Sequence, residues 1–226
     1  MDQDFFMRLS GDIQPFLKSK RAAGENFNLF QICGIARNEV YTHSALLCDL
    51  LNPKGSHDQG SVFLKLFIET LNLDVAVDAG PVSVIPEFYL GPVNGDSGGR
   101  LDILIEIGKD KKIAIENKID AAEQAQWVKR YRNYLGERDI LLYLTLDGRL
   151  PTELEPLQKE QVTCISYGHD ILRWLGACQK VTAAPIVRES LSQYIHLLRH
   201  LTHQEKDHQM TDKIVTAAIA TPESFE

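Results

Sequence analysis

Two short apolar segments around a charged turn constrain the fold of this chain more than any other feature. The runs RLDILIEIG, residues 100–108, and KIAIENKI, residues 112–119, are rich in isoleucine and surround the turn sequence KDKK. Alternating, β-branched runs of this kind indicate strands, and their short connection predicts an antiparallel hairpin. Three charged residues, Asp102, Glu116 and Lys118, interrupt these otherwise buried patterns and require an explanation.

The segments on either side of the hairpin alternate between helical and strand patterns. Apolar residues recur at helical spacing before and after it, and two further apolar runs have the composition of buried strands. Predicted helices cover residues 39–52, 61–73, 121–136, 169–180 and 184–207, and predicted strands cover residues 81–91, 139–146 and 161–167. We expect Ser61 to cap the second helix and Pro86 to interrupt the first strand. This order is typical of an α/β fold with a mixed central β-sheet flanked by helices.

Both ends of the chain predict helical extensions of this α/β core. We divide the chain into an N-terminal helical lead-in, residues 1–38, the core, residues 39–180, and a C-terminal helical extension, residues 181–226. The last residues, MTDKIVTAAIATPESFE, begin another helical pattern that stops without a clear cap. We therefore expect a missing C-terminal region.

Composition and charge narrow the class of protein. With 226 residues, 44% of them hydrophobic and 24% charged, the chain suits an ordinary soluble globular protein. A net charge of −7 argues against affinity of the whole surface for nucleic acid or an anionic membrane, but it allows a local basic patch. The N-terminus lacks the positive charge and apolar centre of a signal peptide, and no apolar run approaches transmembrane length. We expect a cytoplasmic location and no membrane association.

The alternation of side chains brings the three charges of the hairpin to one face. With a three-residue turn centred on Asp110, Asp102 lies opposite Lys118 and diagonal to Glu116. Two partly buried carboxylates repel each other and lose hydration, and a divalent cation such as Mg²⁺ or Mn²⁺ relieves both effects. A neighbouring ammonium group suits the activation of water and the charge of a phosphoryl transition state. The alternative is a solvated strand face with a simple cross-strand Glu–Lys pair.

The order of these motifs resembles the PD-(D/E)xK nuclease superfamily. Asp102 on one strand is followed by Glu116-x-Lys118 on the next and by the sequence EQAQWVKRY. The upstream sequence EVYTHS, residues 39–44, and the segment LLNPKGSHDQG resemble a bacterial branch of the superfamily that opens with an ExxxHS helix. The similarity covers residues 28–206. It implies a restriction-endonuclease-like fold and a Mg²⁺-dependent, or Mn²⁺-dependent, nuclease acting on DNA in bacterial defence or DNA processing.

The resemblance also implies roles for single residues. Asp102 and Glu116 correspond to metal ligands, together with the backbone carbonyl of Asn117, and Lys118 corresponds to the residue that serves the attacking water. Glu39 resembles an acidic residue that supports the same centre. Glu87, on the first strand, is a weaker candidate because Pro86 disturbs the local register.

Further side chains are candidates for substrate binding. If residues 121–136 form one helix, Gln124 and Tyr131 share a face, whereas Gln126 and Tyr131 diverge, and the choice between the glutamines stays open. The full set of candidates is Gln124, Gln126, Lys129, Arg130, Tyr131, Arg100, His43 and Ser44.

Alternatives to these roles also stay open. His43 suits a structural hydrogen bond as well as a role in the site, and Tyr131 suits the buried stripe of its helix. A catalytically inactive module of the same fold, binding nucleic acid or a protein partner, is the alternative function, and a homodimer is an alternative to a monomer.

Overall fold

The centre of the molecule is a single mixed β-sheet. The computed structural model describes residues 18–204, except residues 20, 23, 25 and 153–160. Its five strands follow chain order across the sheet and comprise β1 (Val82–Tyr89), β2 (Arg100–Ile107), β3 (Lys111–Lys118), β4 (Ile140–Thr145) and β5 (Thr163–Ser166). The pairs β1–β2 and β2–β3 are antiparallel, whereas β3–β4 and β4–β5 are parallel. The predicted α/β fold with a mixed sheet flanked by helices is confirmed.

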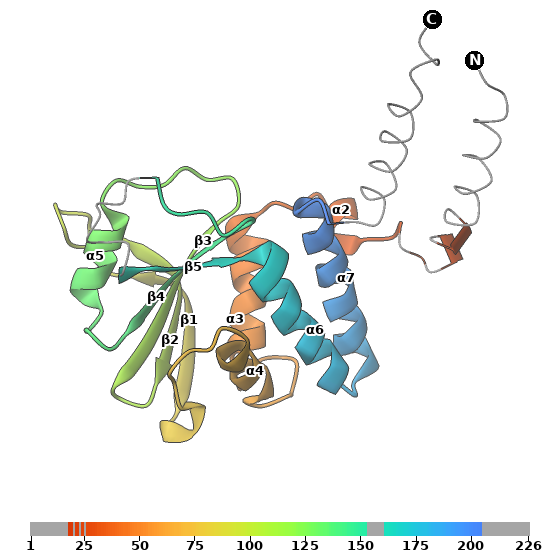
Figure 1. Ribbon diagram of the computed structural model, residues 1–226, viewed down its shortest axis with the longest axis horizontal. Coiled ribbons are helices and arrows are strands. Elements are labelled where there is room, and N and C mark those ends of the chain that lie inside the picture. Colours follow the sequence, from red (N-terminus) through yellow and green to blue (C-terminus); the bar gives the residue numbers. More distant parts are fainter. Residues whose placement is uncertain (1–17, 20, 23, 25, 153–160, 205–226) are drawn as a thin grey trace, which may run out of the picture.

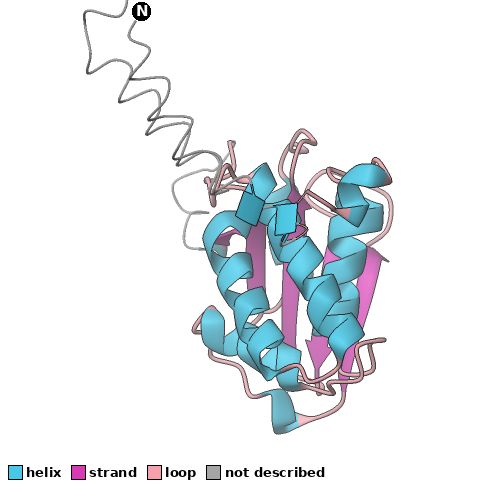
Figure 2. Cartoon of the chain, turned by 90° about the vertical axis from the view of Figure 1, so that its right-hand side faces the viewer, coloured by secondary structure: helices cyan, strands magenta, loops and turns pink. Residues whose placement is uncertain are grey.

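Helices cover both faces of the sheet. Helix α5 (Trp127–Tyr134) lies on one side, and most of the remaining helices pack together on the other, as Figure 1 shows. The elements other than α5 are α2 (Leu29–Ile32), η1 (Glu39–Ser44), α3 (Ala45–Leu51), α4 (Val62–Thr70), η2 (Val77–Ala79), η4 (Tyr167–Ile171), α6 (Leu172–Val181) and α7 (Pro185–Leu201). Figure 2 looks onto the helical layer, with the strands behind it.

Two hydrophobic clusters explain why β3 and β4 are so apolar. Ile113 and Ile115 of β3 face the larger cluster, which also contains residues of α3, α4, α6 and α7. Ala114 of β3 and Tyr143 of β4 face the smaller cluster, which they share with Trp127 of α5. Because both faces are covered, these strands expose almost no side chain, as expected for parallel strands in an α/β layer.

The first strand is not interrupted at Pro86, contrary to the prediction. Strand β1 continues from Val82 to Tyr89, and Pro86 pairs with Ile103. Proline is tolerated because β1 is an edge strand, where one side of the backbone has no neighbouring strand to bond. A local irregularity follows instead at Glu87, whose φ of 51° is left-handed.

The predicted helix over residues 121–136 is too long. Helix α5 begins only at Trp127 and ends at Tyr134. Gln126 has φ 55°, a left-handed conformation that cannot continue a right-handed helix towards the N-terminus. Gln124 and Gln126 therefore do not lie on the helix that carries Tyr131, and the predicted shared face of Gln124 and Tyr131 is wrong.

Smaller differences concern the helix ends. Ser61 precedes α4 but makes no capping hydrogen bond through its side chain, contrary to the prediction. The predicted helix over residues 39–52 is present as η1 followed directly by α3, and it ends before Pro53. Predictions for residues 1–17 and 205–226 lie outside the described residues, and the domain boundaries stay predictions. Among the described helices, none has both the length and the apolarity that a bilayer span requires.

Candidate active site at the ends of β2 and β3

The register of the hairpin places Asp102 opposite Glu116. Residues 108–110 form the turn, which begins at Gly108 with φ 63°, and Ile107 pairs with Lys111. The ladder ends at Ile103 and Ile115, and Asp102 and Glu116 are the residues that follow this last pair on the two strands. The predicted pairing of Asp102 with Lys118 is wrong by two residues, because the left-handed glycine starts the turn earlier than expected. An even shift keeps side chains on the same face, so the predicted convergence survives.

The three charges of the hairpin meet at the end of the two strands. Lys118 Nζ lies 2.7 Å from Glu116 Oε1 and 3.8 Å from Asp102 Oδ2. The backbone N–H of Asn117 donates to Asp102 Oδ2 at 2.6 Å, which fixes that carboxylate against β3. The exposed fractions of the Asp102, Lys118 and Glu116 side chains are 17%, 11% and 7%, so the group is largely withdrawn from solvent.

Burial makes the negative charges of this group unfavourable. Burial, and then the charge of Asp102, raises the pKa of Glu116 to about 8, although Lys118 opposes the shift. Burial likewise raises the pKa of Asp102. Burial by itself disfavours the charged form of Lys118, but the charges of Glu116 and Asp102 outweigh that effect and raise its pKa. Without a further positive charge, Asp102 and Glu116 are therefore difficult to keep ionised at the same time.

The donor set suits a divalent cation. Glu116 Oε2 is buried and has no hydrogen-bond partner within the described part of the chain, which is an unfavourable state for a carboxylate oxygen. The same described residues contain no group of three His, Cys, Asp or Glu side chains close enough to form a complete cage. Mg²⁺ characteristically takes one or two carboxylates and keeps waters, so Asp102 and Glu116 fit it without such a cage.

Glu39 orders the segment that follows Lys118. Its Oε1 accepts hydrogen bonds from the backbone N–H groups of Ile119, Asp120 and Ala121, at 2.7, 2.7 and 2.8 Å. Asp120 also accepts two bonds from Arg37, at 2.6 and 2.5 Å. These contacts hold residues 119–121 in a non-helical path, which explains why the predicted helix starts late.

Asn117 lies on the opposite face of β3 and is fully engaged. Its Nδ2 donates to Ser44 Oγ at 3.0 Å, and its Oδ1 accepts from Tyr167 Oη at 2.9 Å. Ser44 comes from η1 and Tyr167 from η4, and all three residues are buried. Ser44 therefore contacts the strand that carries the charges rather than an open surface.

His43 is buried next to Ser44 and makes two hydrogen bonds of its own. Its Nε2 lies 3.0 Å from the carbonyl oxygen of Ala36 and its Nδ1 lies 2.8 Å from Tyr194 Oη. A carbonyl only accepts, so Nε2 carries the proton and Nδ1 accepts from the tyrosine hydroxyl. Burial lowers the pKa of His43 to about 4, so the ring is neutral at pH 7. His43 thus joins η1 to α7.

The candidates near α5 are mostly engaged within the fold. Arg130 is buried and donates to the Ala125 carbonyl and, at 3.0 Å, to Gln124 Oε1. Tyr131 donates to the Arg100 carbonyl at 2.7 Å and packs in the smaller cluster. Exposed Lys129 lies 3.3 Å from a carboxylate oxygen of Asp96. Gln126 is exposed at the start of the helix, and the side chain of Arg100 pairs with Glu87 at 2.8 Å.

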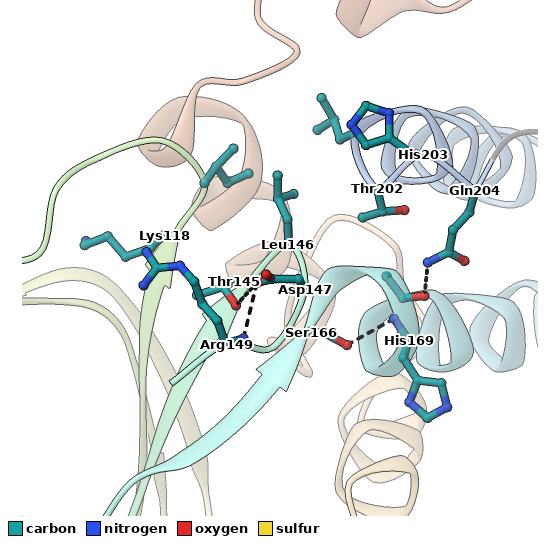
Figure 3. Close-up of a pocket in the computed structure, with 13 residues that line it drawn as sticks. Lys118, Thr145, Leu146, Asp147, Arg149, Ser166, His169, Thr202, His203 and Gln204 are labelled. Carbon is teal, nitrogen blue, oxygen red and sulfur yellow. Dashed lines mark hydrogen bonds between the residues drawn. The ribbon is translucent and has the colours of Figure 1, made fainter. Parts of the chain in front are cut away.

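A cavity next to Lys118 contains residues that the sequence did not single out. It has a volume of about 640 Å³ and lies where the parallel strands β3, β4 and β5 end. Figure 3 shows Lys118 and Arg149 on one side and Thr202, His203 and Gln204 on the other. Ligands of open α/β sheets commonly bind beyond the carboxyl ends of strands, so the ends of the apolar runs were the available signal. The sequence did not reveal which strand ends lie side by side, because the order of the strands in the sheet was unknown, and so the cavity could not be located.

Comparison with known proteins agrees with the geometry. The model of the PD-(D/E)XK nuclease superfamily matches residues 27–203, which include the whole sheet, the charged group of β2 and β3, and most of the helical layer. No curated protein and no solved structure shows significant similarity to the chain. The family match covers well over half of the chain and coincides with the residues that build the site. The chain belongs to the PD-(D/E)XK nuclease superfamily.

Proposed function

We propose that this protein is a metal-dependent nuclease that hydrolyses phosphodiester bonds of DNA with Mg²⁺ or Mn²⁺. The observation that carries the proposal is the buried group of Asp102, Glu116 and Lys118, in which one oxygen of Glu116 has no partner. A cytoplasmic location and a role in bacterial defence or DNA processing belong to the same proposal, and the role rests on the sequence resemblance.

Each residue of the group has a distinct task in the proposal. Asp102 and Glu116 would hold the cation together with the backbone carbonyl of Asn117, which accepts from Lys118 Nζ at 3.2 Å in this structure. The bound cation supplies a Lewis acid that neutralises the carboxylates and favours charge on the reacting phosphate. Lys118 keeps its ammonium group beside the carboxylates through the contact with Glu116, and from there it positions water and stabilises negative charge on the phosphate. Glu39 fixes the backbone that follows Lys118 and keeps this end of β3 in place.

Binding of DNA at this centre depends on the local charge near the site and not on the net charge of the chain. The net charge of −7 repels a polyanion, so cations near the site must compensate. Lys118 and Arg149 line the cavity, where Lys118 pairs with Glu116 and Arg149 with Glu123 at 2.6 Å, so a phosphate that binds here competes with these carboxylates for the two cations. Binding should therefore weaken steeply with salt.

Cleavage assays test the proposal directly. The purified chain is incubated with Mg²⁺ or Mn²⁺ and with plasmid, linear, nicked and single-stranded DNA, next to Glu116→Gln and Lys118→Ala. Glu106→Gln serves as the matched control, because Glu106 lies on β2 near the other end of the hairpin, paired with Lys112. We expect the wild type and Glu106→Gln to cleave at similar rates, and Glu116→Gln and Lys118→Ala to cleave far more slowly. Unchanged cleavage by Glu116→Gln and Lys118→Ala contradicts the assignment.

One observation favours a non-catalytic module as the second candidate. Lys118 already pairs with both carboxylates, so the group is partly charge-compensated without a cation. A module of this kind predicts that Mn²⁺ does not raise the melting temperature, while DNA or a protein partner still binds. Stabilisation by Mn²⁺ that disappears in Glu116→Gln excludes it.

A further inference from the structure

Arg149 is a second cation on the wall of the cavity next to the charged group of β2 and β3. It follows β4 in the chain and lines the cavity together with Lys118, as Figure 3 shows. Tyr143 of β4 pairs with Glu116 of β3, and the guanidinium carbon of Arg149 lies 5.8 Å from the centre of the Tyr143 ring. Neighbouring strands are about 4.8 Å apart, so the Tyr143 ring places Arg149 one strand away from Glu116.

Glu123, the partner of Arg149, has hydrogen bonds beyond this ion pair. Arg149 Nη1 donates to Glu123 Oε1 at 2.6 Å, and the same oxygen accepts from Tyr143 Oη at 2.7 Å. Glu123 Oε2 accepts from the backbone N–H and the hydroxyl of Thr152, at 2.8 and 2.9 Å. Burial raises the pKa of Glu123, but these hydrogen bonds outweigh burial and lower the pKa to about 2. Each oxygen of Glu123 therefore keeps a donor when Arg149 moves away.

Two other cations near the site have partners with fewer hydrogen bonds. Lys118 pairs with Glu116 Oε1, whereas Glu116 Oε2 is buried without a partner in the described part of the chain. Arg100 pairs with Glu87 Oε2, and Glu87 Oε1 likewise lacks a partner there. A carboxylate that is already short of donors becomes still less favourable when its cation leaves. Of these three cations, Arg149 can change its partner at the lowest cost.

The guanidinium of Arg149 has capacity for a further acceptor. An arginine side chain carries five N–H donors, and within the described residues Arg149 donates a side-chain hydrogen bond through Nη1 to Glu123 alone. Its side chain is 44% exposed and lines the cavity, so a ligand can reach it without displacing the core. Arginine can donate two parallel hydrogen bonds to a phosphate group. A phosphate in the cavity therefore offers Arg149 more than Glu123 does.

We propose that Arg149 binds a phosphate of the DNA strand next to the phosphate that is cleaved, and that it leaves Glu123 to do so. The inference rests on the proposed nuclease function. Asp102 and Glu116 serve the cleaved phosphate through the cation, and Lys118 stays with Glu116. Successive charges of one DNA strand are about 3.4 Å apart along the helix axis, so the neighbouring phosphate comes within reach of a cation one β-strand away. Arg149 fixes the position of the DNA strand along the cavity.

The salt dependence of DNA binding tests this contact. Binding of an oligonucleotide to the full chain is measured between about 50 and 200 mM salt. Ca²⁺ replaces Mg²⁺, because it also takes oxygen ligands but in a looser geometry. Arg149→Ala should reduce the slope of log affinity against log salt by about 0.9, the value for one phosphate contact, and weaken binding about tenfold at the lowest salt.

Arg188→Ala is the matched control. The Arg188 side chain is also 44% exposed and also lies near a glutamate, Glu189, but it is on α7 and does not line the cavity. This variant should keep the affinity and the salt slope of the wild type. Arg149→Lys, which retains the charge but not the planar group with two parallel donors, should bind with an affinity between those of Arg149→Ala and the wild type.

Oligonucleotides with one neutral methylphosphonate identify the phosphate that is bound. Replacement of the phosphate next to the cleaved bond should weaken binding by the wild type about tenfold and have no further effect on Arg149→Ala. An unchanged salt slope in Arg149→Ala, or equal losses in both proteins on the substituted DNA, overturns the contact and leaves the proposed function intact if both proteins cleave. A wild type that neither binds nor cleaves DNA overturns both.

Discussion

The two faces of strand β3 differ in whether their polar groups are satisfied. On the face towards η1 and η4, the amide of Asn117 donates to Ser44 and accepts from Tyr167. On the other face, Glu116 has one oxygen bonded to Lys118 and one with no partner among the described residues. Both faces are buried, so burial does not explain the difference. The satisfied hydrogen bonds on the first face hold the strand in place. The unsatisfied carboxylate oxygen on the other face marks a place where a ligand, here a divalent cation, can bind.

The largest expected effect comes from removing the charge on the incomplete face. Glu116→Gln keeps the shape of the side chain but loses a cation ligand, so DNA cleavage should fall by about 10³-fold or more. The metal-free protein should not lose stability, because an unfavourably buried acid is replaced by a neutral group. Cleavage rates and thermal melts in the presence of a chelator measure the two effects, and a large loss of stability would mean that the face is structural.

Lys118→Ala should have the next largest effect on activity. The variant leaves Glu116 without its cationic partner at 2.7 Å, and cleavage should fall about 10²-fold. Single-turnover rates at saturating DNA separate this loss from weaker binding. Lys112→Ala is a suitable control, since Lys112 lies on the same strand and its Nζ contacts Tyr134 rather than the site. Equal rates in the two variants would remove Lys118 from the chemistry.

The complete face predicts a pH effect on stability. His43 is neutral in the fold with a pKa of about 4, but it titrates near 6.5 when unfolded, so the unfolded state takes up a proton first as pH falls. This stabilising contribution is complete above pH 6.5 and is lost between pH 6.5 and 4, by about 2.5 kcal/mol at pH 4.5. Urea unfolding at pH 7.5 and 4.5 should show a smaller acid loss in His43→Gln than in the wild type. Parallel losses would contradict the buried neutral ring.

The smallest effect is expected from one hydrogen bond of the complete face. Tyr167→Phe leaves Asn117 Oδ1 without its donor and should lower the free energy of unfolding by about 1–3 kcal/mol. Because the metal ligands are untouched, Mn²⁺ affinity should stay within a few fold. Chemical denaturation measures the free energy of unfolding, and titration of the same sample measures the Mn²⁺ affinity. A loss of metal affinity without a loss of stability would mean that the Asn117 face, and not the Glu116 face, supports metal binding.

Much of the difference between the two faces of β3 could be predicted from local sequence. Alternation alone puts Glu116 and Lys118 on one face of β3 and Asn117 on the other, because the period of a strand is two residues. The exact partner of Asp102 could not be predicted, since the left-handed Gly108 sets the start of the turn. Asp102 nevertheless stays on the predicted face of its strand, because the register differs from the prediction by two residues and side chains alternate with a period of two.

Long-range contacts account for what local patterns missed. Residues 121–126 have a helical pattern, but Glu39 accepts from the backbone N–H groups of residues 119–121, and Gln126 takes a left-handed conformation. The network around Asn117 depends on Tyr167, far along the chain, and the adjoining bond of His43 depends on Tyr194. Such contacts require the packing of η4 and α7 against η1, which no spacing in the sequence specifies.

The affinity of the chain for Mn²⁺ between pH 6 and 9 tests the central claim most directly. The pKa of Glu116 is raised to about 8, so below that pH a cation must displace its proton. We predict that affinity rises about tenfold per pH unit up to about pH 8 and then levels off, and that Glu116→Gln binds weakly without this dependence. Absence of binding, or equal and pH-independent affinities in both proteins, would contradict a cation site on this face of β3.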